Sequence, residues 1–139
     1  MSILIKNATI VTMNENRDVF GGDLLIENDR ISRIGKLDRY TADMVIDASN
    51  QLLLPGFVQS HVHLCQVLFR GMADDLELLD WLQQRIWPLE ASHDEESLYY
   101  SSILGCAELL RGGTTSIIDM ATVKHTESVF TAVKQAGIR

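Results

Sequence analysis

The alternation of strand-like and helix-like segments after residue 52 is the feature that most limits how this chain can fold. An apolar run at 52–58 leads into a strand that ends near residue 63, and a β-branched strand is predicted at 114–119. Each is followed by residues whose apolar positions recur at helical spacing. Strands that alternate with helices form a parallel sheet, whose faces need helices and whose edges need neighbouring strands. We therefore expect an α/β fold for this part of the chain.

The first two helices after residue 63 are predicted from spacing and from end signals. Leucine, tryptophan and isoleucine residues indicate a helix around 76–86. A capping box is predicted at Ser92, with Glu95 reaching back to it, and this marks the start of the next helix. That helix is expected to stop at Gly112–Gly113, because glycine commonly ends helices.

The last helix is predicted between Thr126, which can cap it, and Gly137, after which Ile138–Arg139 begins a third strand. Two strand–helix units and the start of a third leave a sheet edge and apolar surface uncovered. A closed (β/α)8 barrel takes about 250 residues, whereas this sequence has 139. We expect the front part of a longer polypeptide, truncated after the first two to three βα units of a TIM-type barrel.

Residues 1–54 are predicted to form a separate β-rich module, and residues 55–139 the first part of the barrel. Within the module, Ile3–Ile5 and Thr9–Val11 are predicted as two strands on either side of Asn7, a turn-prone residue. No helix of normal length is expected there. We interpret the module as part of a β-sandwich.

A hairpin is predicted within the module at 23–35, with its turn at Asn28–Asp29, because both turn residues tolerate positive φ. Ile31 and Ile34 are expected to supply part of its core face. Two further strands are predicted around a polar turn, at 44–47 and 51–54.

His61 and His63 lie at the end of the apolar run, and an extended chain places both side chains on one face, opposite Val62. Two neutral imidazoles from one strand make half of a transition-metal site, for which zinc and iron are suitable ions. Cys65 extends the spacing to H-x-H-x-C. It is either a third, thiolate ligand or a small buried thiol, and the buried thiol is the commoner case.

Composition and charge exclude several classes of protein. Hydrophobic residues make up 46% and charged residues 22%, which is typical of a globular protein and not of a disordered one. The net charge of −7, with no basic cluster, argues against a nucleic-acid partner. No apolar stretch approaches the length of a membrane span or a signal peptide. With only Cys65 and Cys106, a reducing, cytoplasmic location is predicted.

The succession LLLPGFV, H-V-H, LFRGMADDLELLDWL, IWPLE and ELLRGGTTSIIDM resembles the metal-dependent amidohydrolase superfamily. Within it, the chain is most similar to deaminases of S-adenosylhomocysteine, 5′-methylthioadenosine and 5′-deoxyadenosine. Chlorotriazine hydrolases and guanine deaminases are nearby relatives. The resemblance extends over essentially the whole chain but only over the beginning of a full-length member.

The resemblance implies a role for particular residues. His61 and His63 match two ligands of one divalent ion, zinc or alternatively iron, and Glu90 matches a carboxylate that receives ribose hydroxyls. Trp81 either walls the substrate pocket or packs in the core. The family's further metal ligands and its acid–base residues match no position here, so the catalytic residues are expected beyond Arg139. The implied reaction is hydrolytic deamination of an adenosine-type nucleoside to the inosine analogue and ammonia.

Other polar residues are expected to act locally. Asp119 is interpreted as bonding loop amides, and His93 and His125 as hydrogen-bonding residues near helix ends. A second class of function stays open, in which the chain is an inactive truncated fragment. A third alternative is a barrel completed by a partner or by another copy, as a homo-oligomer.

Overall fold

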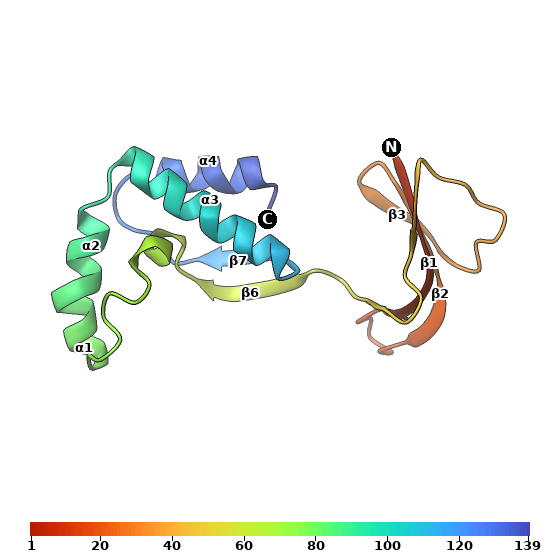
Figure 1. Ribbon diagram of the computed structural model, residues 1–139, viewed down its shortest axis with the longest axis horizontal. Coiled ribbons are helices and arrows are strands. Elements are labelled where there is room, and N and C mark those ends of the chain that lie inside the picture. Colours follow the sequence, from red (N-terminus) through yellow and green to blue (C-terminus); the bar gives the residue numbers. More distant parts are fainter. The chain divides into compact units, whose positions relative to one another are not determined.

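The computed structural model describes residues 1–139 and divides them into two compact units, Met1–Pro55 and Gly56–Arg139. Each unit has its own sheet, as the ribbons in Figure 1 show. None of the helices combines the length and the apolar character needed to cross a membrane.

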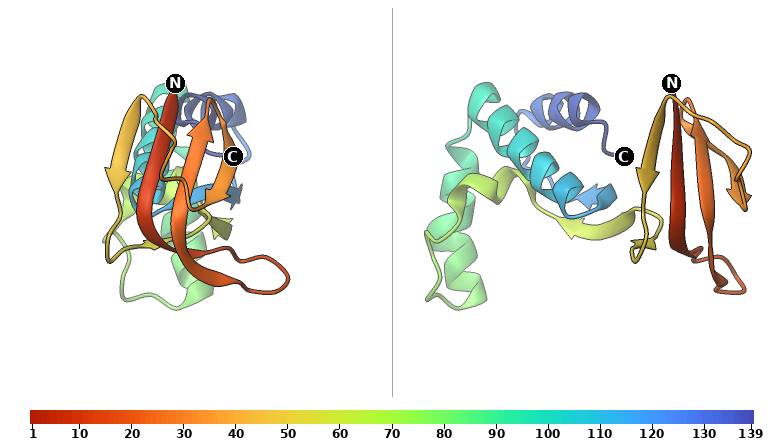
Figure 2. Two further views of the ribbon diagram at one scale, coloured as in Figure 1. Left: turned by 90° about the vertical axis from the view of Figure 1, so that its right-hand side faces the viewer. Right: turned by 45° about the vertical axis from the view of Figure 1, so that its right-hand side comes forward.

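The first unit is a five-stranded sheet in the order β3-β2-β1-β4, with β5 also paired to β1. Figure 2 shows the long strand β1 at its centre. The β1–β2 and β2–β3 pairs are antiparallel, and β4 and β5 run parallel to β1. The strands are β1 (Ser2–Val11), β2 (Val19–Glu27), β3 (Arg30–Gly35), β4 (Met44–Asp47) and β5 (Leu52–Leu53).

The predicted hairpin is confirmed, and Asn28 in its turn has a φ of 59°. The prediction of two strands around Asn7 is wrong, because β1 continues through a bulge at this residue, where φ is 62°. The Asn7 amide donates to Asp23 Oδ1 at 2.9 Å, and the Asn7 side chain donates to Asp47 Oδ1 at 2.9 Å. These bonds replace the missing ladder bonds, so the strand survives the irregularity.

The expected core role of Ile31 and Ile34 is also wrong within this unit. The two side chains are 61% and 47% exposed. They lie on β3, the outermost strand of the sheet, whereas the buried residues come mainly from the central strands β1 and β2. An edge strand has neighbours on one side only, so alternation alone did not locate the core.

The second unit begins with two parallel strands, β6 (Phe57–Val62) and β7 (Thr114–Asp119). The helices α3 (Glu95–Arg111) and α4 (Thr126–Ala136) follow them and lie together on one side of the sheet (Figures 1 and 2). The predicted start of a third strand is confirmed. Arg139 donates to the Thr115 carbonyl at 2.9 Å and accepts from the Ile117 amide at 2.7 Å, the pattern of a parallel neighbour.

Between β6 and α3 the chain forms a short 3₁₀ helix and then a helical column. The 3₁₀ helix is η1 (Leu64–Phe69), and the column consists of α1 (Leu78–Trp81), the π-helical turn η2 (Leu82–Ile86) and α2 (Trp87–Ala91). The prediction that this region is helical is confirmed, but the helical column begins at Leu78 and continues to Ala91, beyond the predicted end at residue 86. Pro88 has no amide hydrogen to donate four residues back, and the ladder adjusts by widening into a π turn.

The capping box of α3 lies two residues later than predicted. Asp94 is the N-cap, its carboxylate accepts from the Ser97 amide at 2.8 Å, and the Ser97 hydroxyl accepts from the Asp94 amide at 3.1 Å. Ser92 cannot cap this helix, because it still has helical dihedrals at the end of α2. The predicted stop at Gly112 is confirmed.

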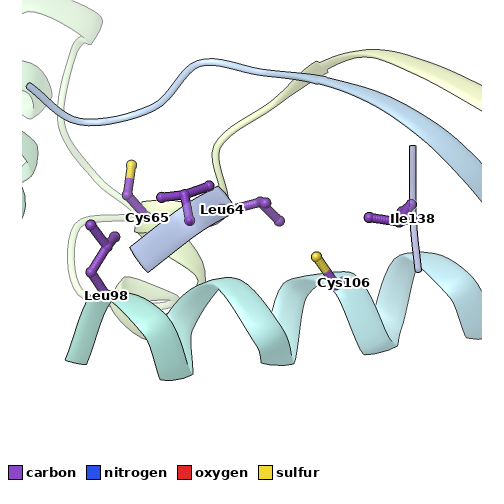
Figure 3. Packing of buried hydrophobic residues seen from close by; sticks show 6 residues of the cluster. Leu64, Cys65, Leu98, Cys106 and Ile138 are labelled. Carbon is purple, nitrogen blue, oxygen red and sulfur yellow. The ribbon is translucent and has the colours of Figure 1, made fainter. Parts of the chain in front are cut away.

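The end of α4 at Gly137, where φ is 75°, is confirmed, whereas its N-cap is His125 and not Thr126. The core of this unit lies between η1, α3, α4 and the chain end. Figure 3 shows Leu98 and Cys106 on α3 close to Leu64, Cys65 and Ile138. Leu64 and Cys65 are both fully buried, so the residues that follow the histidine pair are anchored in this core.

Candidate metal centre

His61 and His63 lie at the carboxyl end of β6 and present their rings to each other. Their Nε2 atoms are 3.0 Å apart, and the ring planes meet at 70°. Val62 between them packs against the buried cluster on the other face. The alternation of an extended chain therefore separates an apolar face, which packs under the helices, from a face that carries both imidazoles.

The hydrogen-bond partner of His63 Nδ1 decides which tautomer this ring adopts. Nδ1 lies 3.2 Å from the carbonyl oxygen of Met120, and a carbonyl only accepts, so Nδ1 carries the hydrogen. In the neutral ring this leaves Nε2 with a free lone pair, directed at His61. A carbonyl that fixes the tautomer of a histidine in this way is a common arrangement around metal ligands.

The distance between the two nitrogens suits a shared ion. Two imidazole nitrogens bound at about 2 Å in tetrahedral geometry lie roughly 3.3 Å apart. The observed 3.0 Å differs from that by a few tenths of an ångström, which small ring rotations supply. The two histidines therefore fit a divalent transition metal as neighbouring ligands.

The end of β7 holds the chain on both sides of His63. The Met120 amide donates to the Val62 carbonyl at 2.7 Å, and Asp119 Oδ1 accepts from the Leu64 amide at 2.8 Å. This confirms the expectation that Asp119 bonds a loop amide. Burial raises the pKa of Asp119, while the Leu64 bond and the nearby His63 oppose the rise. Its second oxygen is buried without a partner.

Cys65 does not join the two imidazoles, so the thiolate-ligand alternative is wrong. The strand ends at Val62 and the chain turns into η1, which carries Cys65 into the core, where it is fully buried. Its thiol donates to Glu90 Oε1 at 3.4 Å. Burial and the charge of Glu90 raise the pKa of this thiol to about 12, so it stays protonated.

Glu90 lies in α2, beyond the carboxyl ends of β6 and β7 (Figure 1). Its side chain is half-buried, and besides the Cys65 thiol it accepts from Gln66 Nε2 at 2.8 Å. Gln66 has no role in the sequence analysis, because no periodic pattern predicts a contact between η1 and a helix 24 residues further on.

The remaining candidates have local roles or stay open. His93 is 8% exposed, and its ring nitrogens lie 2.8 Å from the Cys65 carbonyl and 3.0 Å from the Ser97 hydroxyl, as a local hydrogen-bonding role requires. His125 lies 3.8 Å from Glu95 at the start of α4. Trp81 is half-buried, which is compatible with either of its two interpretations.

The histidine pair is an incomplete site within these 139 residues. No group of three or more histidine, cysteine, aspartate or glutamate side chains comes close enough to hold a metal ion. Zinc sites in proteins use three or four protein ligands, so further ligands are needed to complete this one.

Residues 52–139 match the model of the amidohydrolase family. The chain belongs to the amidohydrolase family. Over 139 residues this amidohydrolase is 46% identical to the 5′-deoxyadenosine deaminase of Methanobrevibacter smithii, covering 99% of this chain and 31% of that protein. It is 41% identical to the 5-methylthioadenosine/S-adenosylhomocysteine deaminase of Thermococcus sibiricus, covering 100% of this chain and 32% of that protein. The chain thus spans about a third of the length of the curated relatives it matches.

Solved structures agree with this assignment. An adenosine deaminase from Xanthomonas campestris, crystallised with bound zinc, is 31% identical to this amidohydrolase, with a TM-score of 0.88 over 99% of this chain and 32% of that chain. A mutant of an atrazine chlorohydrolase from Arthrobacter aurescens, complexed with zinc and atraton, has a TM-score of 0.86 at 23% identity, over 99% of this chain and 34% of that chain. The second likeness shows a shared fold only.

Proposed function

We propose that this chain supplies the first part of a metal-dependent deaminase of adenosine-type nucleosides. The observation that carries the proposal is the pair of converging imidazoles, whose Nε2 atoms are 3.0 Å apart, in a chain 41–46% identical to enzymes named as such deaminases. The substrates would be S-adenosylhomocysteine, 5′-methylthioadenosine or 5′-deoxyadenosine.

The fold proposed for the whole enzyme follows the same division as the sequence. Residues 1–54 would form part of a composite β-sandwich, and residues 55–139 the first βα units of a (β/α)8 barrel. The parallel β6–β7 pair and the bonds of Arg139 to β7 support the barrel. The histidines lie at the carboxyl ends of the strands, where such barrels place their active sites.

His61 and His63 would hold one divalent ion, zinc or alternatively iron. Such an ion, when bound, activates water for hydrolysis at neutral pH. His63 would contribute the lone pair of Nε2, and the Met120 carbonyl selects this tautomer by accepting from Nδ1. Asp119 and Met120 keep the ring in place by bonding the residues beside it.

The reaction would replace the exocyclic amine at C6 of the adenine ring by oxygen from water. The C–N bond breaks, the amine leaves as ammonia, and the inosine analogue forms. Glu90 would accept hydrogen bonds from the ribose hydroxyls, because ionised carboxylates form short, strong bonds with hydroxyl donors. The groups that move protons at the adenine ring are expected outside these 139 residues.

The test of this proposal is ammonia release from 5′-deoxyadenosine by a full-length enzyme that carries this segment. Glu90→Gln should weaken nucleoside affinity about ten-fold or more and leave the metal content unchanged. His63→Gln should instead lower the metal content. Equal loss of metal and affinity in the Glu90 variant, or loss of neither, would contradict the ribose role.

The alternative of an inactive fragment has its own test. Two imidazoles alone do not fix a tetrahedral ion, so the isolated 139-residue chain is expected to bind zinc weakly and to show no turnover. Robust ammonia release from S-adenosylhomocysteine by this chain would refute that expectation. A chlorotriazine- or guanine-type amidohydrolase, a further alternative, would release chloride or ammonia from its own substrate and leave the adenosine-type nucleosides intact.

A further inference from the structure

One oxygen of Glu90 receives two hydrogen bonds, and the other receives none. Gln66 Nε2 lies 2.8 Å and the Cys65 sulfur 3.4 Å from Oε1. The buried side-chain nitrogen and oxygen atoms without a partner belong only to Ser102 and Asp119. Glu90 Oε2 is not among them and accepts no bond, so it is accessible from solvent.

The two donors lie on a firmly anchored piece of chain. The Leu64 carbonyl accepts from the Ser101 hydroxyl at 2.7 Å, and the Cys65 carbonyl accepts from the His93 ring at 2.8 Å. The Leu64 amide is held by Asp119. The partners in these bonds belong to α3, to β7 and to the loop before α3. The segment that they anchor, Leu64 and Cys65, directly follows His63.

We propose that Cys65 and Gln66 are positioning residues that hold Glu90 Oε1 and thereby direct Oε2 toward the vicinal hydroxyls of a ribonucleoside. The proposal rests on the proposed function and adds to it two positioning residues and a preference for nucleosides with both ribose hydroxyls. A carboxylate oxygen has two lone pairs, so Oε2 can accept both hydroxyls while Oε1 stays bonded to the protein. The enzyme would therefore distinguish nucleosides with an intact ribose diol from their deoxy analogues.

Chemistry assigns both neighbours as donors. The Gln66 amide nitrogen only donates, and the fully buried Cys65 thiol has Glu90 Oε1 as its acceptor at 3.4 Å. Both therefore stabilise the ionised carboxylate. Cys65 and Gln66 are adjacent in η1, which begins directly after His63. A displacement of η1 would therefore move both Glu90, through these two bonds, and the histidine pair, through the backbone.

The experiment compares two substrates in a full-length enzyme that carries this segment. One is 5′-deoxyadenosine, and the other is the same nucleoside without its 2′- and 3′-hydroxyls. The readout is the ratio of their kcat/KM values within each variant. Because both values come from one preparation, partial misfolding or metal loss lowers both and leaves the ratio unchanged.

Gln66→Leu is expected to lower this ratio about ten-fold, mostly through KM of the ribonucleoside, since it removes one bond to a charged group. Cys65→Ala should act in the same direction, and Cys65→Ser, which restores a donor, should recover most of the ratio. The matched control is Gln84→Leu, because Gln84 makes a similar 3.0 Å bond to Asp80 on the exposed side of the column. It should leave the ratio at the wild-type value.

The outcomes separate this inference from the proposed function. If Glu90→Gln lowers the ratio and neither Gln66→Leu nor Cys65→Ala does, the positioning role is overturned and the ribose role stands. If Glu90→Gln also leaves the ratio unchanged, the ribose role itself fails. Gln66 is only half-buried, so its variant decides the question even if the fully buried Cys65 does not tolerate substitution.

Discussion

Asp119 offers the sharpest test of how the histidine pair is held. The change Asp119→Ala removes the acceptor of the Leu64 amide, a bond of 2.8 Å, and Leu64 is fully buried. A buried donor left without a partner costs about 1–3 kcal/mol. The Met120 amide still bonds Val62, so the strand pairing beside it should survive and limit the loss to this range. We expect the free energy of unfolding to fall by about 2 kcal/mol.

The assay uses a full-length enzyme that carries this segment, and it measures urea unfolding by circular dichroism together with zinc affinity. Asp80→Ala is the matched control, because Asp80 also accepts one bond, at 3.0 Å from Gln84, but in solvent. Its effect should stay within about 0.5 kcal/mol. Zinc affinity should fall about ten-fold or more in the Asp119 variant, as for other residues that support a metal ligand. Equal stability losses in both variants would refute the reasoning.

Three further changes have defined outcomes. Gly105→Ala should destabilise the protein by about 1–2 kcal/mol in urea unfolding, despite better helix propensity, because the new Cβ would lie 2.8 Å from a Leu64 methyl group; equal or greater stability would contradict this. Hydrogen bonds from the Ser97 amide and hydroxyl lower the pKa of Asp94 below 3.8. The ionised Asp94 cap therefore stabilises the folded protein fully above pH 3.8, and this contribution is lost as the pH falls through the lowered pKa. Asp94→Asn should flatten this acid dependence of the thermal midpoint, and an unchanged slope would count against the cap. In a full-length enzyme that carries this segment, His63→Gln should lower zinc affinity in titration calorimetry and change the unfolding free energy little, and unchanged zinc affinity would remove His63 from the site.

Local rules explain most of the elements that sequence reasoning predicted well. The turn at Asn28 and the helix ends at Gly112 and Gly137 depend on which residues tolerate particular backbone angles. The placement of His61 and His63 on one face depends only on the two-residue period of an extended chain. These preferences act within a few residues, so they can be derived without knowing the rest of the fold.

The predictions that were wrong concern elements whose ends depend on residues outside the local pattern. Asn7 was predicted to separate two strands, yet carboxylates from two other strands bond it into one bulged strand. The capping box moved from Ser92 to Asp94, because the preceding helix continues past Pro88 to Ala91. Each local signal was present, but its outcome depended on neighbours that the local pattern does not contain.

By itself, the sequence determined the strand–helix order, the histidine pair with its common face, and the family resemblance that singled out Glu90. Only the tertiary structure decided which nitrogen of His63 is free, since Met120 lies 57 residues away. It also decided that Cys65 is a buried thiol and that Gln66 bonds Glu90. The physical reason is that backbone periodicity sets the direction of a side chain, whereas its hydrogen-bond partner depends on how separate segments pack.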